Sequence, residues 1–156
     1  MKKVLCIVLA LISVLALAAC AGKEPTAKDV DLAVLKSDML SQLSVENAND
    51  INSAALLGLY GIAAEDIEAS ACYTTMNGVF PDEVVMIKAV DAAAAARVAE
   101  KLNTRVEQVK VQSENYDAEN YALAQKCEVV TEGNYVAMFL SPSYDTLVQL
   151  FNEAVK

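Results

Sequence analysis

The spacing of apolar residues predicts two helices in the stretch that follows residue 28. The first has apolar residues at steps of three and four, the spacing of one buried helix face; these are Leu32, Leu35, Met39 and Leu43. We expect a capping interaction between Thr26 and Asp29 at its start and an end near residue 44. The second helix is expected from about Asn52 to Gly58 or Gly61, because glycine commonly ends helices.

The rest of the chain predicts two units, each with two strands followed by a helix. Residues 67–76 alternate, and residues 83–90 are almost continuously apolar, as in a strand buried on both faces. Asp91 is then expected to cap a long helix. The second unit has strands at 127–131 and 135–140, a tight turn between them, and a C-terminal helix. We therefore predict an α+β fold with an antiparallel sheet of about four strands, preceded by one or two helices.

The apolar run at the N-terminus has the three parts of an export signal. Lys2 and Lys3 precede it, and it extends over residues 4–19. A helix of this length would measure roughly 24 Å, which is too short to span a hydrocarbon core of about 30 Å comfortably. The tetrad LAAC that ends at Cys20 resembles the lipobox of bacterial lipoproteins, in which the cysteine sulfur receives a diacylglyceryl group and the chain is cut just before it.

The lipobox resemblance divides the chain into three parts. We expect residues 1–19 to be a signal peptide, residues 20–28 to carry the lipid on Cys20 and form a flexible tether, and residues 29–156 to form one α+β domain. Two or more acyl chains anchor a protein stably. The expected location is the extracytoplasmic face of the bacterial cell membrane, with the lipid on Cys20 as the contact to the membrane.

Charge and length limit the partners of this domain. Removing residues 1–19 leaves 137 residues, which is enough for one domain with a hydrophobic core. The formal net charge changes from −9 to −11, because Lys2 and Lys3 are lost. An acidic body is repelled by phosphates and anionic head groups, so nucleic acid is not an expected partner.

Two of the four cysteines remain as thiols in the mature chain. Cys6 leaves with the signal peptide and Cys20 is lipidated, so Cys72 and Cys127 either form a disulfide or stay reduced as small apolar side chains. A weak similarity between the two strand-strand-helix units places them at corresponding strand positions. A disulfide would stabilise the domain by about 4 kcal/mol. The chain has no histidine and no close Cys-x-x-Cys pair, so no metal or other cofactor is expected.

Several motifs together resemble a known family. They are the lipobox, LYGIAAEDIEASACY, the Asp-Glu pair in PDEVVMIKA, Arg105, the loop at Tyr116 and GNYVAMFLS. This combination is similar to a family of uncharacterised lipoproteins, common in Clostridia and related Firmicutes, that share a domain of unknown function. The resemblance covers about residues 29–153 and implies an extracytoplasmic α+β domain with no assigned activity.

The sequence favours a binding or accessory module over an enzyme. Without histidine, the usual nucleophilic triads are absent, and no residue is predicted to be catalytic. Asp82 and Glu83 would point to opposite faces of a strand, and they are expected, like the other acidic clusters, to be solvated surface. Among the tyrosines, Tyr116 and Tyr121 are the best candidates to contact an envelope protein or glycan. The alternatives are a small-molecule receptor and a carboxylate-dependent hydrolase of the cell envelope.

Overall fold

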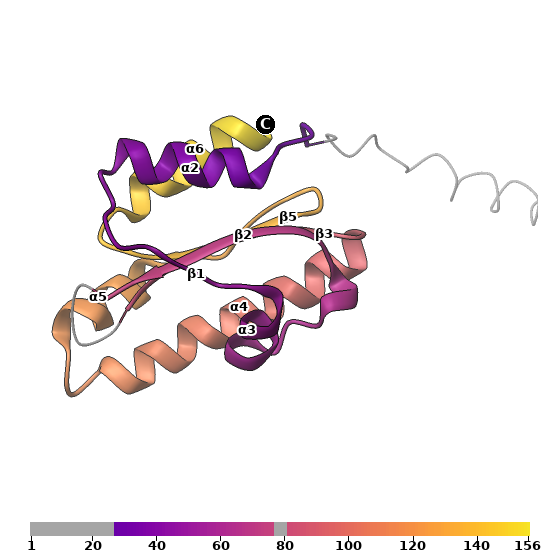
Figure 1. Cartoon of the computed structure of the whole chain (residues 1–156). Helices are drawn as coiled ribbons and strands as arrows, with labels where there is room; N and C mark the ends of the chain where they lie inside the picture. Colours follow the sequence, from indigo (N-terminus) through magenta and orange to yellow (C-terminus); the bar gives the residue numbers. More distant parts are fainter. Residues whose placement is uncertain (1–26, 77–80) are drawn as a thin grey trace, which may run out of the picture.

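A computed structural model describes residues 27–76 and 81–156. These residues form a sheet that is covered by helices on both faces (Figure 1). Helices α2 and α6 lie on one face, and α3 and α4 on the other. The elements, in chain order, are α2 (Leu32–Gln42), β1 (Asn49–Asp50), α3 (Ser53–Tyr60), the 3₁₀ turn η1 (Ala64–Asp66), β2 (Ile67–Thr75), β3 (Asp82–Ala89), α4 (Ala92–Ser113), α5 (Ala118–Lys126), β4 (Val130–Glu132), β5 (Tyr135–Leu140) and α6 (Tyr144–Val155).

The described residues form a five-stranded sheet with the order β1-β2-β3-β5-β4. Each neighbouring pair is antiparallel, with β3 at the centre, where Val85 pairs with Cys72 of β2 and with Met138 of β5. The α+β prediction and the two strand-strand-helix units are confirmed. The fifth strand is β1, whose two residues pair with Tyr73 and Thr74. A strand of two residues is too short to produce a pattern of alternation, so the sequence did not predict it.

Alternate residues of the central strands enter two separate cores. On the α2 and α6 side, Met39 packs with Phe139 and Phe151, whose rings meet edge to face at 5.9 Å. On the other side, Val85 and Met138 pack against α3 and α4. Both faces of β3 and β5 are therefore buried, and for β3 this confirms the prediction from the continuous apolar pattern of residues 83–90.

Capping interactions fix where the helices begin and end. Asp91 Oδ1 accepts from the Ala94 N–H at 2.7 Å, so the predicted cap of α4 is confirmed. Gly61 ends α3 with φ of +67°, a conformation that suits glycine because it has no Cβ. The start predicted for α2 is wrong. Its cap is Asp31, which accepts from Ala33 and Val34, and Thr26 lies outside the described residues.

The strand predicted at 127–131 begins later than expected. Cys127 is the C-terminal cap of α5, and β4 starts at Val130. The reason is local, since the Cys127 N–H donates to the Leu123 carbonyl and so completes the last turn of the helix. Within residues 27–76 and 81–156, no helix combines the length and the hydropathy needed to cross a bilayer.

Candidate functional site

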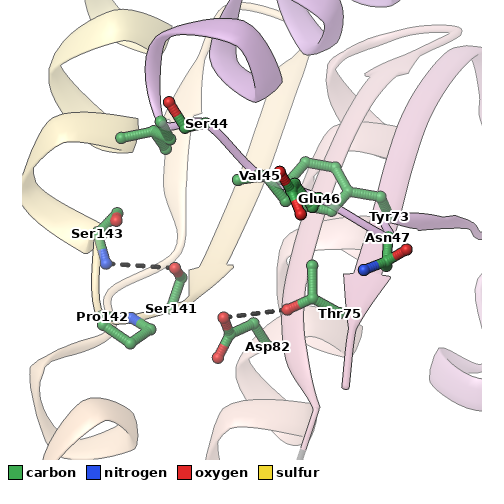
Figure 2. A pocket seen from close by; sticks show the side chains of 11 residues that line it. Ser44, Val45, Glu46, Asn47, Tyr73, Thr75, Asp82, Ser141, Pro142 and Ser143 are labelled. Atoms are coloured by element: carbon green, nitrogen blue, oxygen red, sulfur yellow. Dashed lines mark hydrogen bonds between the residues drawn. The ribbon is translucent and has the colours of Figure 1, made fainter. Parts of the chain in front are cut away.

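A polar pocket of about 460 Å³ opens at one end of the sheet (Figure 2). Three segments that are distant in sequence form it: the loop between α2 and β1, the adjoining ends of β2 and β3, and the turn between β5 and α6. We call it the sheet-end pocket. Its lining residues are Leu43, Ser44, Val45, Glu46, Asn47, Tyr73, Thr75, Asp82, Ser141, Pro142 and Ser143.

The loop after α2 is held in shape by backbone hydrogen bonds. The Val45 N–H donates to the Leu40 carbonyl at 2.9 Å, and the Ser44 N–H donates to the Ser41 carbonyl at 3.2 Å, which together make a Schellman ending. Ser44 has φ of +51° and Asn47 has φ of +59°. A serine in the left-handed region is unfavourable by about 1–2 kcal/mol. Such conformations concentrate at functional sites, and here both residues with this conformation line the pocket.

Hydroxyl and carboxylate groups dominate the lining of the pocket. Thr75 Oγ1 donates to Asp82 Oδ2 at 3.1 Å across the β2–β3 pair. On the opposite wall, the Ser143 N–H donates to Ser141 Oγ at 3.2 Å. Tyr73 is 2% exposed, and burial, followed by the negative charge of Asp82, raises the pKa of Tyr73 to about 12. Because no lysine or arginine is among the lining residues, the pocket combines negative charge with many hydrogen-bonding groups.

Glu83, the neighbour of Asp82, points to the opposite face of the sheet, as the alternation along a strand predicted. It is 4% exposed and is held by two residues from the α3 and α4 side. Tyr60 donates its hydroxyl hydrogen to Glu83 Oε2 at 2.8 Å, and Arg105 Nε donates to both carboxylate oxygens at 3.1 Å, while Arg105 Nη2 donates to Oε1. The Glu83 carboxylate raises the pKa of Arg105. Burial, followed by that carboxylate, raises the pKa of Tyr60.

The expectation that the acidic clusters are solvated surface is therefore wrong for two members. Glu83 is buried against Arg105, and Asp66 is 8% exposed beside Arg97, whose Nε donates to both Asp66 oxygens at 3.2 and 3.3 Å. The Arg97 guanidinium lowers the pKa of Asp66. A sequence cannot reveal which acidic residue meets an arginine that lies 22 or 31 positions away.

The two cysteines of the domain are free and buried. Cys72 lies in β2, and its Sγ donates to the Met86 carbonyl at 3.6 Å. The two cysteines do not occupy the corresponding strand positions that the sequence suggested, because Cys127 caps the end of α5 before β4 begins. Burial raises the pKa of each of these thiols to about 11. Both cysteines belong to the core on the α3 and α4 side.

The two predicted tyrosines are not among the residues that line the sheet-end pocket. Tyr116, in the turn between α4 and α5, is 89% exposed, and Tyr121 in α5 is half-buried. Cys20 lies outside the described residues. In the part of the chain that the structure describes, no group of three metal-ligating side chains comes together.

Sequence reasoning missed most of the residues that line the sheet-end pocket. The polar stretch SVENAND and the turn SPS were visible as loop signals. Neither signal indicates that the two loops meet at one end of the sheet, because that depends on the adjacency of β3 and β5. Asp82 had been noted through its place in an acidic pair, but it was expected to be solvated surface.

Comparison with known proteins gives one result about this chain. The comparisons with curated proteins and with solved structures gave no match. The family model described as "Domain of unknown function (DUF4358)" matches residues 41–141, which include the ion pair of Glu83 and Arg105 and most of the sheet-end pocket. Because the match covers more than half of the 156 residues, the chain belongs to the DUF4358 family.

Proposed function

We propose that this protein is a lipid-anchored binding module of the extracytoplasmic membrane face and that it takes a small hydroxyl-rich ligand, such as a sugar unit of a glycan, in the sheet-end pocket. The observation that carries the proposal is the lining of that pocket, which combines several hydroxyl groups with the carboxylates of Glu46 and Asp82. Carboxylates and hydroxyls pair with the hydroxyl groups of a sugar, because each of those groups both donates and accepts hydrogen bonds.

The charge of the pocket restricts the class of ligand further. Glu46 and Asp82 favour a neutral or cationic ligand, and no lining lysine or arginine is present to balance a phosphate. A sugar that carries an amino group combines both requirements. We therefore expect amino sugars to bind more tightly than neutral sugars, and phosphorylated sugars to bind least.

A titration with three probes of the same ring tests this order. Glucosamine, glucose and glucose 6-phosphate are titrated into the protein, and affinities are measured by calorimetry or NMR. Asp82→Asn should weaken glucosamine binding by about tenfold, since a hydrogen bond to a charged group contributes about 1.5–3 kcal/mol. The matched control is Glu107→Gln, an exposed acid on α4 that should leave the affinity unchanged. Preference for the phosphorylated sugar, or no saturable binding of any probe, contradicts the proposal.

The anchor is tested separately from the pocket. The LAAC tetrad supports lipid attachment at Cys20. Cys20→Ala should abolish incorporation of labelled fatty acid and release the protein from the membrane fraction, whereas Cys72→Ala should change neither. Unchanged membrane association of the Cys20 variant would argue against the lipobox assignment.

A carboxylate-dependent hydrolase is the second candidate function, because Glu46 and Asp82 line the same pocket. Most glycoside hydrolases use a pair of carboxylates as their catalytic residues. Release of nitrophenol from nitrophenyl glycosides separates the two functions. Turnover that is lost in both Glu46→Gln and Asp82→Asn favours the hydrolase, and saturable binding without turnover favours the binding module.

A further inference from the structure

The polar groups that line the sheet-end pocket lie at two depths. Its rim is the loop at residues 44–47, whose polar side chains are exposed. Its floor is formed by Tyr73, Thr75 and Ser141, which are at most 8% exposed. A polar group of a ligand that reaches the floor leaves water, so the floor residues must replace the hydrogen bonds that it loses. The floor therefore influences the choice of ligand more strongly than the rim.

Two of the three floor side chains already have a hydrogen-bond partner in the protein. Thr75 Oγ1 donates to Asp82 Oδ2 at 3.1 Å, and Ser141 Oγ accepts from the Ser143 N–H at 3.2 Å. The Tyr73 hydroxyl, in contrast, makes no hydrogen bond with another residue of the described ranges 27–76 and 81–156. Buried tyrosines usually have a partner for the hydroxyl group, so this one requires an explanation.

Contact with the sheet-end pocket provides that explanation. Tyr73 belongs to the core on the α2 and α6 side, and Figure 2 shows its ring beside Val45 and Glu46 of the rim. Among the buried side chains that the structure describes, the polar atom that is fully enclosed without a partner is Thr74 Oγ1, so the Tyr73 hydroxyl is not fully enclosed. After burial, the charge of Asp82 is the second cause that raises the pKa of Tyr73, which places the hydroxyl on the pocket side of the ring.

The Tyr73 hydroxyl suits an uncharged polar group of the ligand. Because its pKa is about 12, it keeps its proton at neutral pH and can donate one hydrogen bond and accept another. An amino sugar brings an ammonium group and several hydroxyl groups. The ammonium group has no acceptor, and the carboxylates of Glu46 and Asp82 attract it. A hydroxyl group, which both donates and accepts, is therefore the part of the sugar that matches Tyr73.

We propose that Tyr73 is a specificity-determining residue of the sheet-end pocket and that its hydroxyl forms a hydrogen bond with one hydroxyl group of the bound sugar. This inference rests on the proposed function, because it assigns the contact of the same ligand at the floor of the pocket. A sugar without that hydroxyl group would displace water from Tyr73 and leave the phenol unpaired, so it would bind more weakly.

Four glucosamine analogues, each without a different one of the four hydroxyl groups, test this contact. Calorimetry or NMR measures the affinities of glucosamine and of the analogues for the wild type and for Tyr73→Phe, which keeps the ring and removes the hydroxyl. In the wild type, the loss of one particular hydroxyl group should weaken binding by about fivefold, the usual effect of one hydrogen bond between uncharged groups. In Tyr73→Phe, the same analogue should bind as tightly as glucosamine, because the partner of the missing group is already absent.

Stability and a second tyrosine provide the controls. Tyr73→Phe should bind glucosamine about fivefold more weakly than the wild type. Its Tm should not fall, because the hydroxyl that it removes has no partner among the described residues. Tyr116→Phe is the matched control and should leave all affinities unchanged, since Tyr116 is 89% exposed and does not line the pocket. A merely structural role of Tyr73 would weaken the binding of glucosamine and of all four analogues by the same factor, and this result would overturn the proposal.

The outcomes separate this inference from the proposed function. If the wild type binds glucosamine saturably and Tyr73→Phe binds it equally tightly, the contact at Tyr73 is refuted, while the proposed function stands. If the wild type binds none of the sugars, the proposed function fails, and the contact at Tyr73 fails with it. A loss that is confined to one analogue in the wild type and is absent in Tyr73→Phe supports both.

Discussion

Removing the positive charge beside Glu83 should strongly destabilise the domain. In Arg105→Met, the apolar stem of the side chain is kept, but Glu83 loses the donor that reaches both of its oxygens. The Glu83 side chain is 5% exposed, and the Arg105 side chain is 21% exposed. Breaking a buried ion pair by removing one partner costs about 3–5 kcal/mol. Because Arg105 retains some contact with water, we expect a loss near the lower limit, about 3 kcal/mol.

Urea unfolding followed by circular dichroism measures this loss, and a double variant identifies its cause. Glu83→Gln combined with Arg105→Met removes both charges and should recover about 2 kcal/mol relative to Arg105→Met alone, because no unpaired carboxylate remains. The control is Lys110→Met, whose partner Glu107 is exposed, and which should change the stability by at most about 0.5 kcal/mol. A loss below about 1 kcal/mol at pH 7, or a double variant no more stable than Arg105→Met, would refute the reasoning.

Three further outcomes follow from the structure. Ser44→Gly should stabilise the domain by up to about 1 kcal/mol in urea unfolding, since glycine adopts φ of +51° without strain; a clear loss of stability contradicts this. Asp91→Ala should destabilise α4 by about 1 kcal/mol, because the Ala94 N–H loses its acceptor, and an unchanged urea midpoint contradicts it. Under reducing conditions, raising the pH from 7 to 10 should cost about 1.4–2 kcal/mol for each of Cys72 and Cys127. The reason is that the unfolded thiols ionise near pH 8.5–9, whereas the folded thiols have a pKa of about 11. Stability is thus lost as the pH rises above the unfolded pKa, and Cys72→Ala should show a shallower decline than wild type.

Local signals in the sequence were reliable where the structure depends on neighbouring residues. The apolar spacing of Leu32, Leu35 and Met39 predicted the buried face of α2, and Asp91 predicted the start of α4. These signals work because a helix repeats every 3.6 residues and a cap acts over three residues. The predictions were wrong at two element boundaries. Asp31 and not Thr26 caps the start of α2, and Cys127 completes the last turn of α5 before β4 begins.

The sheet-end pocket was not predictable from these local signals. It needs the loop at Ser44 to meet the turn at Ser141. This arrangement depends on the strand order, which places β5 and not β4 next to β3. Hydrophobic periodicity says which face of a strand is buried, but it does not say which strand is its neighbour.

The sequence by itself determined the class of fold, the two units of paired strands and a helix, and the opposite orientations of Asp82 and Glu83, because each follows from short-range periodicity. The tertiary structure alone decided that Glu83 is buried. An acidic residue is stable in a core only when a cation and hydrogen-bond donors surround it. Here Tyr60 and Arg105 provide them from two helices, 23 residues before and 22 residues after Glu83 in the chain.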